Sequence, residues 1–218
     1  MTMSLKEVYN SNVEIRLDGI VLKGNLCIPQ NTKGIVIFSH GSGSSRFSPR
    51  NKFVAEILQK NGLATLLFDL LTENEDRIYD NRFDIDLLTM RLIDVTQWIQ
   101  HNDITSDLLI GYFGASTGAA SALRAAAFFD KDIDAVVSRG GRPDLALGHL
   151  KKVTAPTLLI VGGRDDVVIQ LNEKAYQNLN CTKKLEIVPR ATHLFEEEGK
   201  LEIVANISAE WFTKWLNK

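Results

Sequence analysis

Residues 108–129 read LLIGYFGASTGAASALRAAAFF, and this stretch decides the fold. The apolar run 108–113 predicts a strand, and the alanine-rich run that ends at Phe129 predicts a helix. Between them, 114–118 reads G-x-S-x-G. On a sharp turn from strand to helix, this motif lifts its serine above the edge of a sheet as a nucleophile. Ser116 is therefore the candidate nucleophile, and the alternative is a serine that merely caps the helix.

Strands and helices alternate outward from this turn. The sequence patterns predict further strands at 14–17, 21–28, 34–39, 63–69, 135–138, 157–161 and 184–188, and helices at 50–61, 83–100, 117–129, 144–150, 172–179 and 203–216. The segment 72–81 is polar and predicts a loop. Asp18-Gly19 between the first two strands signals a hairpin. We therefore expect an α/β fold, a mostly parallel sheet with helices on both faces and an antiparallel hairpin at the N-terminal edge.

The composition fits one folded domain. The chain has 218 residues, of which 44% are hydrophobic and 24% charged, as in globular proteins. No repeat, low-complexity tract or linker interrupts it, so we expect a single domain over 1–218. The formal net charge of -2 provides no basic surface for nucleic acid or an anionic membrane.

The sequence shows no export or membrane signal. Residues 1–19, MTMSLKEVYNSNVEIRLDG, lack the apolar segment of a signal peptide. No apolar run approaches the roughly 18 residues of a transmembrane helix. Cys27 and Cys181 are able to pair, but two cysteines form no disulfide framework and suit a reducing compartment. We expect a cytoplasmic monomer or homodimer.

Residues that follow strands are the first candidates for chemistry, because ligands bind beyond the carboxyl ends of parallel strands. His193 follows the predicted strand 184–188 and is the candidate base, which takes the Ser116 proton and returns it to the leaving group. The order Ser, Asp, His along the chain supports this role. The alternative is a solvated loop histidine. The chain has four histidines, and the other three are His40, His101 and His149.

The acid that orients the base is one of two neighbours. Asp165 and Asp166 both follow the predicted strand 157–161. A carboxylate there would fix the histidine tautomer and stabilise the imidazolium. Adjacent side chains do not both point at one imidazole. We favour Asp165, because 167–169 must return to the core, and we expect Asp166 to be a turn residue.

The segment 39–46, SHGSGSSR, follows another predicted strand and is rich in glycine. A tetrahedral intermediate needs two backbone N–H donors for its oxyanion. We expect Thr117, directly after the nucleophile, to supply one and Ser42 to supply the other. Neither a phosphate-binding loop nor a dinucleotide fingerprint is present, and no cluster has metal-ligand spacing. No cofactor or metal is expected.

Five motifs together resemble those of the α/β-hydrolases, in particular the dienelactone-hydrolase-like branch of small serine esterases. They are SHGSGSSRFSPRN (39–51), GYFGASTG (111–118), SRGGRPDLAL (138–147), LLIVGGRD (158–165) and ATH (191–193). The resemblance covers nearly the whole chain and implies an eight-stranded sheet with a triad of Ser116, His193 and Asp165. Dienelactone hydrolase itself has a cysteine nucleophile where this chain has serine. The resemblance therefore implies hydrolysis of carboxylic esters rather than of dienelactone.

The substrate class follows from two features. The connection 139–150 is short, so we expect an open site without a large cap, suited to short acyl esters or small lactones. Arg46, Arg139 and Arg142 lie on loops near the predicted site and suit an anionic substrate group. The alternative is that they pair with acidic side chains, which are Asp144, Glu73, Glu75 and Asp76.

Three classes of function remain open from the sequence. The first is a serine hydrolase of carboxylic esters. The second is the same triad acting on thioesters or amides or in acyl transfer, because the acyl-enzyme is common to all of them. The third is a non-catalytic binding protein on the same fold, since fold alone does not establish activity.

Overall fold

The computed structural model describes residues 9–217. The sheet consists of strands β1 Tyr9–Leu17, β2 Ile20–Ile28, β3 Gly34–Ser39, β4 Ala64–Phe68, β5 Leu109–Ala115, β6 Ala135–Arg139, β7 Thr157–Gly162 and β8 Lys183–Val188. The α-helices are α1 Pro49–Lys60, α2 Glu73–Asp76, α3 Ile85–Gln100, α4 Gly118–Phe129, α5 Asp166–Asn178 and α6 Lys200–Leu216. Short 3₁₀ turns lie at η1 Tyr79–Phe83, η2 Asp130–Asp132, η3 Pro143–Ala146 and η4 Leu150–Lys152.

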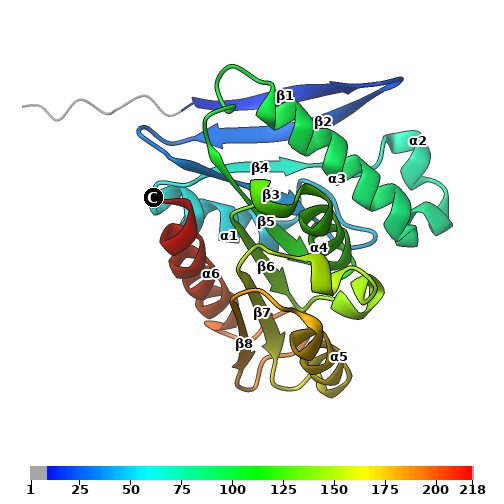
Figure 1. The fold of residues 1–218 in the computed structure, drawn as a ribbon, viewed down its shortest axis with the longest axis vertical. Helices are drawn as coiled ribbons and strands as arrows, with labels where there is room; N and C mark the ends of the chain where they lie inside the picture. Colours follow the sequence, from blue (N-terminus) through cyan, green and yellow to red (C-terminus); the bar gives the residue numbers. More distant parts are fainter. Residues whose placement is uncertain (1–8, 218) are drawn as a thin grey trace, which may run out of the picture.

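The eight strands form one sheet in the order β1-β2-β4-β3-β5-β6-β7-β8 (Figure 1). β1 and β2 pair antiparallel, and β2 pairs antiparallel with β4. Every pair from β4 to β8 is parallel. The predicted mostly parallel sheet with an antiparallel hairpin at its edge is confirmed. The carboxyl ends of β3, β5, β6 and β7 therefore meet at one edge, with β5 at the centre.

Helices cover both faces of the sheet and divide the core in two. One apolar cluster packs α3, α4 and α5 against the sheet, with Leu92, Leu123 and Ala175 as examples. The other packs α1 and α6 against the opposite face, with Val54 and Phe212 fully buried. Within the described part of the chain, the connection between β6 and β7 holds only η3 and η4 and forms no large cap. This leaves the carboxyl edge of the sheet uncovered there.

The structure corrects several predicted boundaries. The segment 72–81, predicted as a loop, contains α2, because Thr72 and Glu75 form a reciprocal capping box. The helix predicted at 172–179 begins at Asp166, where the acidic first turn favours the helix dipole. The helix predicted at 144–150 is replaced by the two 3₁₀ turns η3 and η4.

Two further expectations concern the chain as a whole. Among residues 9–217, no helix is long and apolar enough to cross a membrane. Residues 1–8 and 218 lie outside the described residues. The expectation that 1–19 is no signal peptide and the expected domain range 1–218 both include some of them.

Candidate active site

Ser116 sits on the turn between β5 and α4 in a strained conformation. Its φ of 51° lies in the left-handed region, which non-glycine residues rarely adopt. Neighbouring backbone holds it there: Ser116 N donates to Arg139 O at 3.2 Å, and Ser116 O accepts from Arg142 N at 3.0 Å. The end of β6 and the residues directly after it therefore hold the strained residue from both sides.

The two motif glycines allow strand and helix to approach closely. A Cβ on Gly114 would lie 2.4 Å from Ala119 Cα, and a Cβ on Gly118 would lie 2.1 Å from Ser39 O. Both distances are far below van der Waals contact, and the opposing atoms are backbone. The two glycines of the G-x-S-x-G pattern are therefore required for the packing of this turn.

His193 and Asp165 are joined by a hydrogen bond. His193 Nδ1 and Asp165 Oδ2 lie 2.7 Å apart, and both side chains are partly buried. The loop around His193 is ordered by Glu197, whose carboxylate accepts from Thr192 N at 3.0 Å. Because Nδ1 faces the carboxylate, Nε2 is the nitrogen left to meet a substrate or a hydroxyl.

The backbone after β6 connects this pair to the serine turn. Gly140 directly follows Arg139, whose carbonyl binds Ser116, and a Cβ on Gly140 would lie 3.5 Å from His193 Cε1. No hydrogen bond among the described residues joins Ser116 to His193. Catalytic hydrogen bonds are often long without substrate and tighten when it binds.

Asp165, rather than Asp166, is the acid that meets His193. Asp165 is the N-cap of α5, and its carbonyl accepts from Ile169 N at 2.9 Å. Asp166 lies in the first turn of that helix. The argument from 167–169 holds only in part, since Val168 is buried but Val167 is exposed.

The two expected oxyanion donors lie next to each other at the serine turn. Ser42 N donates to Thr117 Oγ1 at 2.9 Å, which ties the glycine-rich turn to the residue after Ser116. A Cβ on Gly41 would lie 3.1 Å from Ser116 Cβ, so the two turns touch. The Ser42 N–H is engaged by the threonine hydroxyl, a contact that no sequence pattern predicted.

His40 holds the glycine-rich turn in place, a role that sequence reasoning missed. Leu70 N donates to His40 Nε2 at 3.1 Å. An amide only donates, so Nε2 is unprotonated and Nδ1–H donates to Gly41 O at 3.0 Å. The ring is buried, and burial lowers the pKa of His40 below 6.5. The His-Gly dipeptide directly after a strand is the signal from which this role was inferable.

Two of the three candidate arginines are paired with carboxylates. Arg46 forms an ion pair with Asp69, and its backbone N donates to the same carboxylate at 2.8 Å. Arg142 binds Asp144 through two hydrogen bonds, at 2.9 and 2.8 Å. The sequence prediction named Asp144 as an alternative partner but not Asp69.

Arg139 has a different environment. Its side chain is buried, with only 7% of the residue exposed. Among residues 9–217, its one side-chain hydrogen bond is a long one of 3.4 Å, from Nη2 to Asn51 Oδ1. Burial, and to a smaller extent the charge of Arg50, lower the pKa of Arg139 to about 10. A buried cation with no carboxylate partner in the described part of the chain is energetically costly.

Comparison with known proteins finds one matching family model and solved structures of the same fold. A family model described as "Alpha/beta hydrolase domain" matches residues 32–208. A crystal structure of dienelactone hydrolase from Anabaena variabilis is 54% identical, with a TM-score of 0.94 over 96% of this chain and 99% of that one. Est1E from Butyrivibrio proteoclasticus, at 20% identity and a TM-score of 0.81 over 95% of this chain and 99% of that one, shares the fold.

Curated relatives add different names. Proteins named "Putative phosphoribosyl transferase" from two strains of Mycobacterium tuberculosis are 54% identical over 203 residues, which is 93% of this chain and 46% of each relative. The chain thus spans about half the length of these relatives. A thiohydrolase of Aspergillus aculeatus is 28% identical over 140 residues, which is 63% of this chain and 43% of that protein.

Proposed function

Because this chain belongs to the α/β-hydrolase family, in its dienelactone-hydrolase-like branch, we propose that it is a serine hydrolase of carboxylic esters. The substrates are small or short-acyl esters or lactones, since the β6–β7 connection forms no large cap over the carboxyl edge. Ser116 is the nucleophile, His193 the general base and Asp165 the acid that orients the imidazole. Thr117 and Ser42 supply the oxyanion donors.

The reaction runs through an acyl-enzyme. Ser116 Oγ attacks the ester carbonyl while His193 Nε2 takes its proton, and the oxyanion accepts from the Thr117 and Ser42 amides. The oxyanion replaces Thr117 Oγ1 as the acceptor for the Ser42 N–H. His193 returns the proton to the departing alcohol. Water, deprotonated by His193, then attacks the acyl group, and the acid leaves as Ser116 regains its proton.

The observation that carries this proposal is the 2.7 Å contact between His193 Nδ1 and Asp165 Oδ2. A carboxylate on Nδ1 holds the tautomer in which Nε2 accepts a proton. The same structure holds Ser116 at positive φ on the turn between β5 and α4. The strained turn after β5 and the oriented imidazole after β8 lie at the same edge of the sheet, and acyl transfer needs both a nucleophile and a base.

A second candidate is thioester hydrolysis by the same residues. The observation that favours it is the similarity to a thiohydrolase, at 28% identity over 140 residues. A thiolate leaves without protonation more readily than an alkoxide, so thioesters depend less on His193 as an acid. The phosphoribosyl transferase name belongs to proteins about twice this length, and the hydrolase family model matches residues 32–208 of this chain.

An anionic substrate group is a further part of the proposal, with Arg46, Arg139 and Arg142 as its contacts. Arg46 and Arg142 already carry carboxylate partners, so a substrate carboxylate exchanges with Asp69 or Asp144. Comparing a neutral ester with a carboxylated ester of equal size tests this. Arg142→Ala is expected to reduce the preference for the carboxylated ester, and an unchanged preference rejects this contact.

Labelling and turnover together test the proposed function. A fluorophosphonate probe is expected to add one label at Ser116, detected by intact mass and peptide mapping, and the Ser116→Ala variant is expected to take none. Oxygen esters, thioesters and amides of matched acyl length then rank the reactions. Faster turnover of thioesters supports the second candidate. Absence of both labelling and turnover in folded protein supports a binding protein instead.

A further inference from the structure

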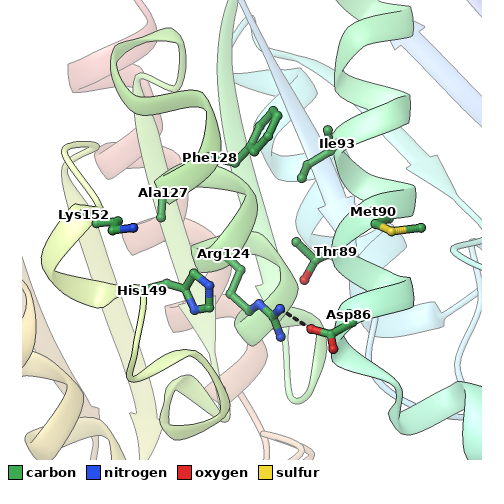
Figure 2. Close-up of a pocket in the computed structure, with 9 residues that line it drawn as sticks. All are labelled: Asp86, Thr89, Met90, Ile93, Arg124, Ala127, Phe128, His149 and Lys152. Atoms are coloured by element: carbon green, nitrogen blue, oxygen red, sulfur yellow. Dashed lines mark hydrogen bonds and ion pairs between the residues drawn. The ribbon is translucent and has the colours of Figure 1, made fainter.

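A surface groove lies between α3 and α4, away from the proposed catalytic residues. Its volume is ≈ 650 Å³, within the range of small-molecule sites. Four residues of α3, three of α4 and two from the turns around η4 line it, and we call it the α3–α4 groove (Figure 2). Neither Ser116, Asp165 nor His193 belongs to its lining.

One part of the groove is apolar and open to solvent. Phe128 is 62% exposed and Met90 is 56% exposed, which is unusual for side chains of this size. Ile93 of α3 lies close to Phe128 of α4, and Met90 and Ala127 also line the groove (Figure 2). Exposed apolar side chains that gather in a concave surface mark binding sites more often than scattered ones.

The other part of the groove is cationic. Arg124 extends from α4 between His149 and Asp86, and Lys152 lies on the same side as His149 (Figure 2). Asp86 forms an ion pair with Arg124. Arg124 Nε is buried and meets no acceptor among the described residues. Neither the His149 ring nor the Lys152 ammonium has an ion-pair or hydrogen-bond partner in residues 9–217.

The electrostatics of the groove favour a single negative charge. Arg124 and Lys152 bring two positive charges and Asp86 one negative charge, so with neutral His149 the lining carries a net charge of +1. Partial burial, followed by the charges of Arg124 and Lys152, lowers the pKa of His149. A bound anion would offset that repulsion and favour the protonated ring.

We propose that the α3–α4 groove binds a small amphipathic monocarboxylate, with its carboxylate among Arg124, His149 and Lys152 and its apolar body against Phe128, Met90 and Ile93. Arginine and lysine together suit a carboxylate, and the apolar wall suits a medium-length alkyl chain or an aromatic ring. A monoanion balances the lining charge, whereas a phosphate monoester brings close to two negative charges. This site is separate from the proposed reaction and does not depend on it.

Calorimetry with sodium octanoate tests the proposal, with octanol and octyl phosphate as matched ligands. Octanoate is expected to bind more tightly than either. Histidine proton resonances, assigned with His149→Gln, locate the site: octanoate is expected to raise the pKa of His149. Binding that perturbs His193 and leaves His149 unchanged overturns the proposal, because the ligand then occupies the proposed active site. Equal affinity for octanol, or tighter binding of octyl phosphate, also overturns it.

Two variants test the two ends of the groove separately. Lys152→Met and Phe128→Ala each change an exposed side chain and are each expected to weaken octanoate binding about three- to tenfold. Lys152→Met should leave octanol binding unchanged, whereas Phe128→Ala should weaken both. The matched control is Lys151→Met, which removes the same charge one residue away, outside the lining. Equal weakening by Lys151→Met shows nonspecific attraction and overturns the proposal.

Discussion

Replacing Asp165 by asparagine tests the proposed chemistry most directly. The side chain keeps its shape and loses its charge. In the native site, Asp165 Oδ2 lies 2.7 Å from His193 Nδ1 and holds one imidazole tautomer. An asparagine amide is able to donate to Nδ1 instead, which moves the ring proton to Nε2. A protonated Nε2 does not accept the Ser116 proton, so the base is lost although the fold is intact.

The expected rate loss is large and the expected stability loss is small. The same substitution in a serine protease triad lowers kcat about 10⁴-fold, which corresponds to about 5.4 kcal/mol of barrier. The two side chains are 17% and 37% exposed, so their hydrogen bond stabilises the fold by no more than about 1 kcal/mol. In a chain of 218 residues, that lowers Tm by at most about 4 °C.

Asp166→Asn is the matched control, since it makes the same chemical change at the adjacent residue. Asp166 lies in the first turn of α5, where its loss costs about 0.3–1 kcal/mol of helix-dipole interaction. The two variants should therefore have similar Tm values. The assays are kcat/KM on a short-acyl ester, the rate of fluorophosphonate labelling at Ser116, and thermal unfolding. The reasoning is refuted if Asp165→Asn keeps more than about a tenth of the native rate, or if Asp166→Asn loses as much.

Other substitutions test the packing, the oxyanion turn and the buried histidine. Gly118→Ala places a Cβ 2.1 Å from Ser39 O, so it should lower the free energy of unfolding by about 3 kcal/mol or more and Tm by about 6 °C or more. Gly148→Ala meets nothing within 4 Å and should leave Tm almost unchanged; similar Tm values for both variants would contradict the clash. Thr117→Val removes the acceptor that competes for the Ser42 N–H, so kcat should rise about two- to tenfold. A fall in kcat would show instead that the hydroxyl assists the reaction. Thr117→Ser keeps the hydroxyl and should match the native rate. Burial lowers the pKa of His40 below 6.5, so the unfolded chain binds more protons and the free energy of unfolding should fall as pH drops below about 6.5. Chemical denaturation at a series of pH values should show a smaller fall for His40→Gln than for the native protein. An equal fall in the two proteins would reject this cause.

Much of the fold was predictable because its signals are local. Strand β3 is buried along its whole length and reads as a continuous apolar run. Asp18-Gly19 correctly marked the hairpin between β1 and β2. The early start of α5 was harder to predict, because the candidate acid Asp165 stands at its N-cap and the segment around it reads as a loop. There, a residue that caps a helix also contacts His193.

The side-chain partners were less predictable, because they depend on contacts between distant segments. Asp165 and His193 were inferred from the order Ser, Asp, His along the chain and from their positions after strands of one parallel sheet. The pairing of Arg46 with Asp69 joins the turns after β3 and β4, and no local pattern identifies it. The bond from Ser42 N to Thr117 Oγ1 likewise joins two turns that lie far apart in the sequence, after β3 and after β5.

Gly118 is needed for packing at this site, whereas His193 and its partner Asp165 are needed for the proposed chemistry. Gly118 is required because the end of β3 lies directly against the start of α4, and that contact exists whether or not Ser116 reacts. The hydrogen bond between Asp165 and His193 adds little to stability, because the pair is partly exposed. A costly backbone turn therefore supports the serine, and a weakly stabilising pair orients the proposed base. Glycine variants should lower stability and labelling together, whereas Asp165→Asn should lower labelling alone, which separates packing from chemistry.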